Sequence, residues 1–261
     1  INKLATVIGL RGPAGNAPRD AAVFVGPYEH HSNDLVWRES PATLVRIPLD
    51  AEGRLCLATL AAELPKYAGR GLLIGSFSAA SNVTGVRTDM RALGRLLHGH
   101  GAWFFADYAA GGPYLDIDMG ESAPGANDHC DAIFVSPHKF IGGPGASGVL
   151  VADRRLFANA IPTVPGGGTV DYVSASRQRY LSDIEHREEA GTPAIPGDIR
   201  AGLAFALKAE IGARRIEALE NAIVRRVLTD WQQNPAIEVL GPTNEERLAI
   251  FSFNIRAGET Y

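Results

Sequence analysis

A chain of 261 residues, 46% of them hydrophobic, is long enough for one large domain and part of a second. Its net charge of −4, without a basic block, argues against nucleic acid as the main partner. We expect no membrane span, because no apolar run approaches ~20 residues, and no signal peptide. Two cysteines are too few for a disulfide framework, so we expect a cytoplasmic protein.

The predicted elements alternate between strand and helix. Five short apolar runs predict strands, and most are continuous rather than alternating, as in a parallel sheet covered on both faces. Thr88 and Asp89 can cap a helix whose apolar face contains Leu93, Leu96 and Leu97. The strands are Ala21–Val25, Leu72–Phe77, Trp103–Ala106, Ala132–Val135 and Gly148–Ala152.

Towards the end of the chain, apolar residues at steps of three and four from Ile199 to Trp231 predict one long helix, kinked near Gly212. Two further apolar stretches, 237–240 and 250–255, would begin a smaller α+β unit. The prediction is therefore an α/β fold with a mainly parallel sheet flanked by helices. We place the large domain at 1–212, and the connecting helix with the start of a small domain at 213–261. Both ends look like cuts through a longer protein.

Polar side chains follow four of the predicted strands. His30 and His31 follow the first, Asn82 the second and Asp107 the third, while Ser136, His138 and Lys139 follow the fourth. Ligands of open α/β sheets bind beyond the carboxyl ends of the strands. These residues therefore form the candidate site.

Lys139 is the first candidate for chemistry. A lysine after a buried strand, in a glycine-rich turn, is expected to be partly desolvated, which favours the neutral amine. A neutral amine can attack a carbonyl and form a Schiff base. The alternative is an ordinary surface lysine in a loop.

Asp107 ends an apolar strand, so its carboxylate needs a partner. A protonated pyridine nitrogen would serve, and so would a salt bridge or a helix N-terminus. An imidazole such as His30 can stack on a ring or move protons. His129 and His138 are further potential zinc ligands, but no HxxxH or CxxC spacing accompanies them, so we expect no metal.

Several segments, in order along nearly the whole chain, resemble the class V aminotransferase family of fold type I pyridoxal-phosphate enzymes. The closest resemblance is to group II cysteine desulfurases and selenocysteine lyases. The segments are Glu29–Asn33, Ser81–Gly85, Asp107–Ala109, Ser136–Phe140 with the glycine loop 142–145, Gly166–Gly168 and Arg187–Pro193.

The resemblance implies a role for each matching residue. Lys139 would hold pyridoxal 5'-phosphate as a Schiff base and later carry a proton. His30 would stack on the pyridine ring, and Asp107 would pair with its nitrogen. The remaining assignments are Asn82 near the phenolic oxygen, Ser136 and His138 on the phosphate, and Thr192 on the phosphate bound by a partner chain.

The role of Thr192 on the phosphate of a partner chain implies a homodimer with shared active sites.

The sequence departs from the family at Ala110, which stands where the family usually has glutamine. Neither Cys56 nor Cys130 stands at the position of a persulfide-forming cysteine. We expect that cysteine, and the arginine that grips the substrate carboxylate, beyond Tyr261, and the phosphate-capping loop upstream of Ile1.

The leading hypothesis is a pyridoxal-phosphate enzyme that acts on a small amino acid, removing sulfur or selenium from cysteine or selenocysteine. Transamination, racemisation (epimerisation) and β-elimination would use the same residues. A second hypothesis is a catalytically degenerate homologue that serves as a dimeric scaffold. A third is a different α/β protein that uses Lys139 to bind a phosphate alone.

Overall fold

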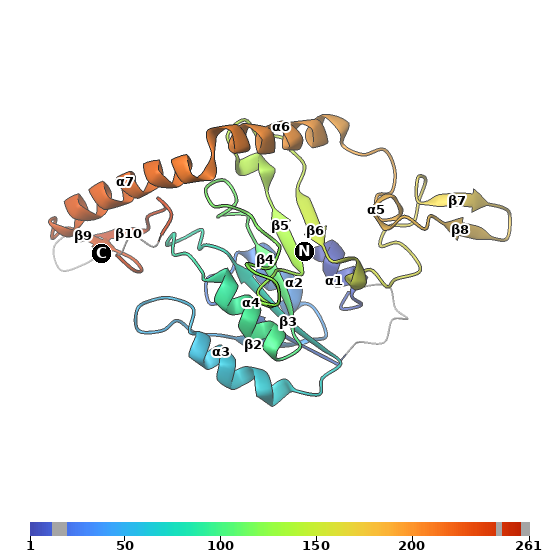
Figure 1. Ribbon diagram of the computed structural model, residues 1–261, viewed down its shortest axis with the longest axis horizontal. Helices are drawn as coiled ribbons and strands as arrows, with labels where there is room; N and C mark the ends of the chain where they lie inside the picture. Colours follow the sequence, from blue (N-terminus) through green and yellow to red (C-terminus); the bar gives the residue numbers. More distant parts are fainter. Residues whose placement is uncertain (12–19, 244–246, 257–261) are drawn as a thin grey trace.

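The computed structural model describes residues 1–11, 20–243 and 247–256. Its centre is a six-stranded sheet in the order β2-β1-β3-β4-β5-β6 (Figure 1). The first five strands in this order are parallel, and β6 is antiparallel to β5. The strands are β1 (Ala21–Val25), β2 (Thr43–Arg46), β3 (Leu72–Ser78), β4 (Trp103–Asp107), β5 (Ala132–Val135) and β6 (Val149–Ala152).

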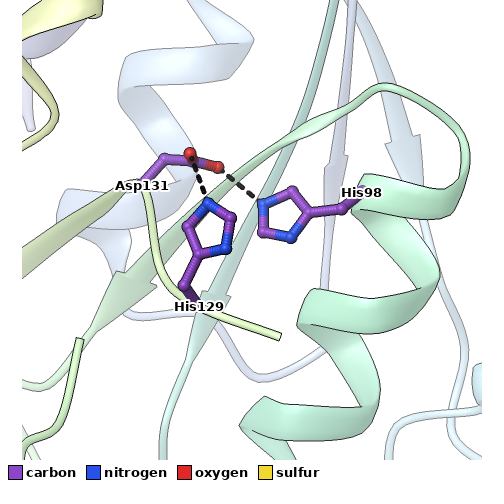
Figure 2. A group of neighbouring side chains, drawn as sticks. All are labelled: His98, His129 and Asp131. Atoms are coloured by element: carbon purple, nitrogen blue, oxygen red, sulfur yellow. Dashed lines mark hydrogen bonds and ion pairs between the residues drawn. The ribbon is translucent and has the colours of Figure 1, made fainter. Parts of the chain in front are cut away.

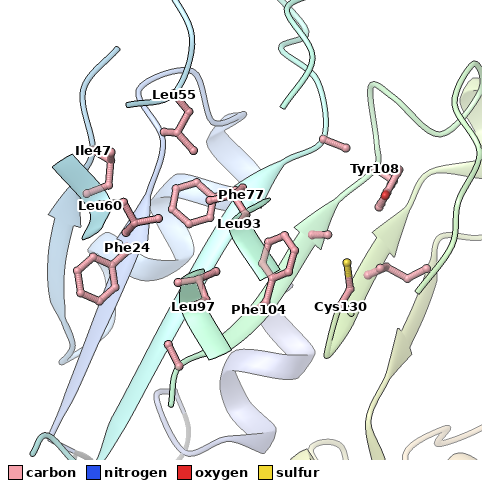
Figure 3. Packing of buried hydrophobic residues seen from close by; sticks show 14 of the residues in the cluster. Phe24, Ile47, Leu55, Leu60, Phe77, Leu93, Leu97, Phe104, Tyr108 and Cys130 are labelled. Atoms are coloured by element: carbon pink, nitrogen blue, oxygen red, sulfur yellow. The ribbon is translucent and has the colours of Figure 1, made fainter. Parts of the chain in front are cut away.

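Helices cover both faces of the sheet, which explains why its central strands are apolar on both sides. Phe24 and Phe104 pack with residues of α3 and α4, as Figure 3 shows for Leu60, Leu93 and Leu97. Alternate strand residues, such as Val23 and Phe105, pack with α1 and α2 on the opposite face. These helices are α1 (Asn2–Val7), α2 (His31–Arg38), α3 (Leu57–Glu63) and α4 (Met90–Gly99).

The predicted sheet strands are confirmed to within a residue or so at their ends. Asp89 caps α4 by accepting a hydrogen bond from the Ala92 N–H at 2.9 Å, also as predicted. Strand β2, which has four residues and a single buried side chain, was not predicted. Short 3₁₀ turns complete this part of the fold: η1 (Leu64–Tyr67), η2 (Pro137–Lys139) and η3 (Arg154–Leu156).

After β6 and η3 the chain leaves the central sheet. A hairpin of β7 (Val170–Val173) and β8 (Gln178–Tyr180) projects beyond the sheet and is followed by α5 (Ile184–Arg187) (Figure 1). The predicted long helix is two helices, α6 (Ile195–Ile211) and α7 (Ala213–Gln232). Gly212 separates them at a φ of 85°, which other residues rarely adopt. β9 (Ile237–Val239) and β10 (Phe253–Ile255) then pair antiparallel.

Among the described residues, no helix combines the length and apolar character that crossing a bilayer requires.

Candidate active site

A pocket of about 1050 Å³ opens at the carboxyl ends of the parallel strands. Its lining includes five of the seven predicted site residues, contributed by the segments that follow β1, β4 and β5. Strand β6 and the α5 region supply the facing wall. The five are His30, Asp107, Ser136, His138 and Lys139.

Asp107, the last residue of β4, is buried, with 5% of its surface exposed. Its carboxylate accepts a hydrogen bond from the Ala109 N–H at 2.8 Å, and within the described part of the chain it has no ion pair. Burial raises the pKa of Asp107, and the nearby charges of Lys139 and His30 only partly oppose this effect. A cationic group placed in the pocket would therefore find a buried carboxylate whose charge the neighbouring residues only partly balance.

Lys139 ends the 3₁₀ turn η2, directly after β5 and Ser136. Gly143 closes the loop so tightly that a Cβ there would lie 1.8 Å from the Pro137 carbonyl oxygen. The neighbouring Phe140 anchors this loop to α6 through an edge-to-face contact with Phe205, with ring centroids 5.1 Å apart. The backbone at Lys139 is therefore held on both sides.

The expectation that Lys139 is desolvated is wrong for the chain as described, because the residue is exposed. It lies at the rim of an open pocket, and no described element covers it. His138 and His30 are exposed at the same rim. His30 caps α2, and its Nδ1 accepts a hydrogen bond from the Ser32 N–H at 3.2 Å.

Glu29 is a residue to which the sequence analysis gave no role. Its carboxyl group accepts hydrogen bonds from Gly26 N, Ser78 N, Ser78 Oγ and Asn33 Nδ2, at 2.7–3.2 Å. It thus connects the segments that follow β1 and β3, next to His30. Burial raises the pKa of Glu29 to about 7, against the effect of these hydrogen bonds. Its position after an apolar strand was the only sequence signal for this role.

The other two predicted residues lie outside the pocket lining. Asn82 is exposed in the turn after β3. In this turn Ser81 Oγ accepts hydrogen bonds from the backbone N–H groups of Val83 and Thr84. Thr192 is exposed just before α6. Neither Cys56, at the N-terminus of α3, nor the buried Cys130 lines the pocket.

Comparisons with known proteins agree with this arrangement. Residues 5–261 match the family model described as aminotransferase class-V. A probable cysteine desulfurase of Pyrococcus abyssi is 32% identical over 240 residues, which are 89% of this chain and 56% of that protein. One from Halalkalibacterium halodurans is 28% identical over 237 residues, or 89% of this chain and 55% of that protein.

A solved structure gives the same result. The apo cysteine desulfurase of Thermococcus onnurineus NA1 superimposes with a TM-score of 0.81 at 28% identity, covering 97% of this chain and 61% of that one. The chain thus spans little more than half the length of the relatives that it matches. Because the family model covers nearly the whole sequence, the chain belongs to the aminotransferase class-V family.

Proposed function

We propose that this protein is a pyridoxal-phosphate-dependent enzyme that removes sulfur or selenium from cysteine or selenocysteine. One observation carries the proposal: a buried carboxylate, Asp107, which forms no ion pair with any described residue, lines the same pocket as Lys139 and His30. The naming of both sequence relatives as probable cysteine desulfurases supports the choice of substrate.

The residues of the pocket fit this cofactor. Asp107 offers a buried anion for a pyridinium nitrogen, and Lys139 offers a primary amine at the end of the tightly held turn η2. Ser136 and His138 directly precede Lys139 in the sequence and would bind the phosphate. Asn82 would approach the phenolic oxygen after a movement of its exposed turn.

Each residue then has a distinct task. When bound, the cofactor supplies an electron-withdrawing ring that stabilises negative charge at Cα of the amino acid. The Asp107 carboxylate keeps the proton on the ring nitrogen, which strengthens that effect. Nζ of Lys139 takes the proton from Cα and returns it, and the His30 imidazole covers the ring face.

We extend the proposal to a homodimer in which Thr192 reaches the partner's phosphate site. A stripe of α6 that follows Thr192 supports it: Ile195, Ile199 and Leu203 are 52–65% exposed. The opposite face of α6 is buried at Ala201 and Ala204. An exposed apolar stripe of this length is typical of an association surface. A monomer by light scattering would contradict this part.

We place the boundary of the large domain at Gly212, where α6 ends, with 213–261 as the start of the small domain. A cytoplasmic location is supported by the content of two cysteines, both unpaired.

The decisive experiment is incubation with pyridoxal 5'-phosphate followed by borohydride, then peptide mass spectrometry. We expect a visible absorption band that borohydride removes, and a cofactor-sized mass increase on the peptide containing Lys139. Lys139→Ala loses both, whereas Lys66→Ala, which changes an exposed lysine on another face, keeps them. Alanine release from cysteine in the presence of a thiol then tests the substrate. A band without alanine release would favour another reaction of the same cofactor or the dimeric scaffold, and no band would overturn the proposal.

A further inference from the structure

A second cluster of polar side chains lies at the amino ends of the strands, away from the pocket. It consists of His98 in the last turn of α4, and of His129 and Asp131 in the segment leading into β5 (Figure 2). Ligand atoms of all three lie within 4.8 Å of one another. The Asp131 side chain is 3% exposed, that of His98 9% and that of His129 27%.

The hydrogen-bond partners of His98 demand a cation. Its Nδ1 lies 2.9 Å from the carbonyl oxygen of Asn127, and its Nε2 lies 2.9 Å from Oδ2 of Asp131. Both partners are acceptors, whereas a neutral imidazole has one N–H to donate. If Nδ1 donates to Asn127, a proton or a metal ion must stand between Nε2 and the carboxylate.

His129 points at the same carboxylate without a good hydrogen bond. Its Nε2 is 3.4 Å from Oδ1 of Asp131, and its buried Nδ1 makes no hydrogen bond but lies 3.8 Å from Oε1 of Glu121. The rings of His98 and His129 stack with centroids 4.1 Å apart. One proton on His98 would satisfy its two acceptors but leave Nε2 of His129 without a hydrogen bond, whereas one divalent ion would bind Nε2 of both rings.

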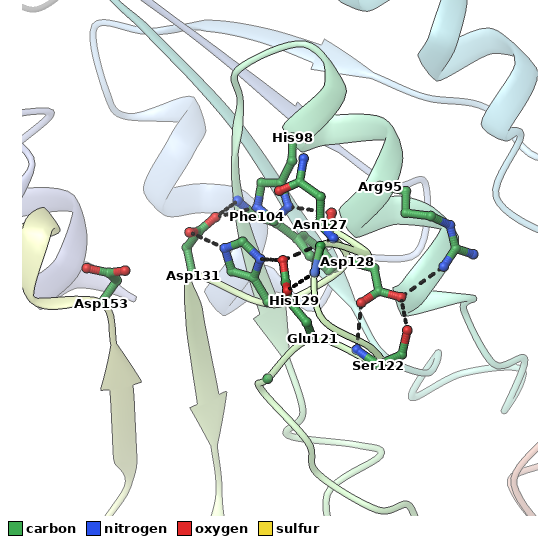
Figure 4. A network of polar contacts seen from close by, with 12 residues as sticks. Arg95, His98, Phe104, Glu121, Ser122, Asn127, Asp128, His129, Asp131 and Asp153 are labelled. Atoms are coloured by element: carbon green, nitrogen blue, oxygen red, sulfur yellow. Dashed lines mark hydrogen bonds and ion pairs between the residues drawn. The ribbon is translucent and has the colours of Figure 1, made fainter.

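The surroundings hold the ligands in place (Figure 4). The Phe104 N–H donates to Oδ2 of Asp131 at 2.7 Å, which fixes the carboxylate. The Asn127 carbonyl fixes the tautomer of His98, as backbone carbonyls do for zinc-bound histidines. Arg155 is the competing cation, 3.9 Å from Oδ1, but it is bonded more closely to Asp153, at 2.7 Å.

We propose that His98, His129 and Asp131 bind a divalent transition-metal ion of the zinc class, with solvent as the fourth ligand. Two imidazoles and a carboxylate are ligands that zinc accepts, at 2.0–2.2 Å, so shifts of under about 1 Å would complete the site. The ion would tie the end of α4 to the amino end of β5. The role is structural and independent of the proposed reaction. No metal was expected from the sequence because no HxxxH or CxxC spacing is present, and the ligands of this site come from separate segments.

Zinc titration of the tag-free, chelator-treated protein by calorimetry tests this site. We expect one Zn²⁺ per chain and a higher melting temperature, with no response to Mg²⁺, which prefers oxygen ligands. His98→Ala and His129→Ala should each weaken zinc binding about tenfold or more. His100→Ala, an exposed histidine at the end of the same helix, is the matched control and should bind normally.

The partly exposed position of His129 makes His129→Ala the variant that tests the site with least disturbance of the fold, checked by circular dichroism in chelator. Cobalt substitution gives a second readout, because the visible spectrum of Co²⁺ changes when imidazole nitrogens coordinate it. The proposal is overturned if the unaltered protein binds no zinc, or if His98→Ala and His129→Ala bind it as tightly as His100→Ala.

Discussion

Two buried aspartates lie at opposite ends of the sheet, Asp107 as the last residue of β4 and Asp131 directly before β5, and their surroundings differ. Asp107, at the carboxyl end, accepts a hydrogen bond from Ala109 and has no ion pair among the described residues. Asp131, at the amino end, lies within 3.4 Å of two histidine side chains and also accepts the Phe104 N–H. The fold therefore gives Asp131 several protein partners, with or without the proposed metal ion, and gives Asp107 a single backbone hydrogen bond.

The two aspartates therefore differ in what their burial does: that of Asp131 serves the fold, and that of Asp107 serves ligand binding. A buried charge that has its partners contributes to a unique structure, and removing a partner is costly. A buried charge without partners reduces stability in the free protein and can recover that loss when a cationic ligand binds. The same residue type thus has opposite expected effects on stability at the two ends.

The largest expected effect is at the amino end. Asp131→Ala leaves the Phe104 N–H and the His98 ring without their acceptor, so we expect a loss of about 3–5 kcal/mol in the free energy of unfolding. Urea denaturation in the presence of chelator measures it. Asp118→Ala, which removes an exposed partner of Arg91, should cost no more than about 1 kcal/mol. Equal losses of unfolding free energy for Asp131→Ala and Asp118→Ala would show that the partners of Asp131 contribute no more than an exposed ion pair.

The sequence predicted the sheet better than its surroundings. Continuous apolar runs identify strands buried on both faces, and the residues after them identify the site edge. The missed strand β2 has one buried residue, Val45, so its pattern carries little signal. The antiparallel direction of β6 depends on the path of the chain and not on its apolar pattern.

The position of the site could be predicted from the sequence, but the solvent exposure of its residues could not. The order of His30, Asp107 and Lys139 after successive strands placed them around one pocket. The exposure of Lys139 could not be read from the sequence, because it depends on what covers the pocket. The cluster around Asp131 combines a helix and a loop some 30 residues apart in sequence, a distance at which spacing motifs give no information.

The second effect is a pH dependence at Glu29. The raised pKa means that between about 4.5 and about 7 the folded state holds a proton that the unfolded state has lost. Stability should therefore fall as pH rises through this window, by on the order of 3 kcal/mol, and then level off. Glu29→Gln cannot titrate, but it turns an amide towards Asn33 Nδ2, so it should be less stable than the unaltered protein by about 1–2 kcal/mol at pH 4.5.

The advantage of the unaltered protein should therefore fall as pH rises, vanish within this window and reverse by about pH 7, because only the unaltered protein loses stability. Urea denaturation at half-unit pH steps measures it. A difference that grows with pH would mean that folded Glu29 is ionised throughout, with its four hydrogen-bond donors outweighing its burial.

The smallest effect, and the one opposite in sign, is at Asp107. Asn can still accept the Ala109 N–H, and it removes a carboxylate whose pKa burial has raised. A folded-state pKa above the ordinary value makes the ionised carboxylate a net cost at pH 7, so Asp107→Asn should leave the free protein as stable or up to about 1 kcal/mol more stable. Pyridoxal phosphate should then stabilise the unaltered protein more than the variant, because only the carboxylate can hold the ring proton. Melting temperatures with and without cofactor measure both effects. A loss of stability in the free variant would place Asp107 with Asp131, as a residue whose burial serves the fold.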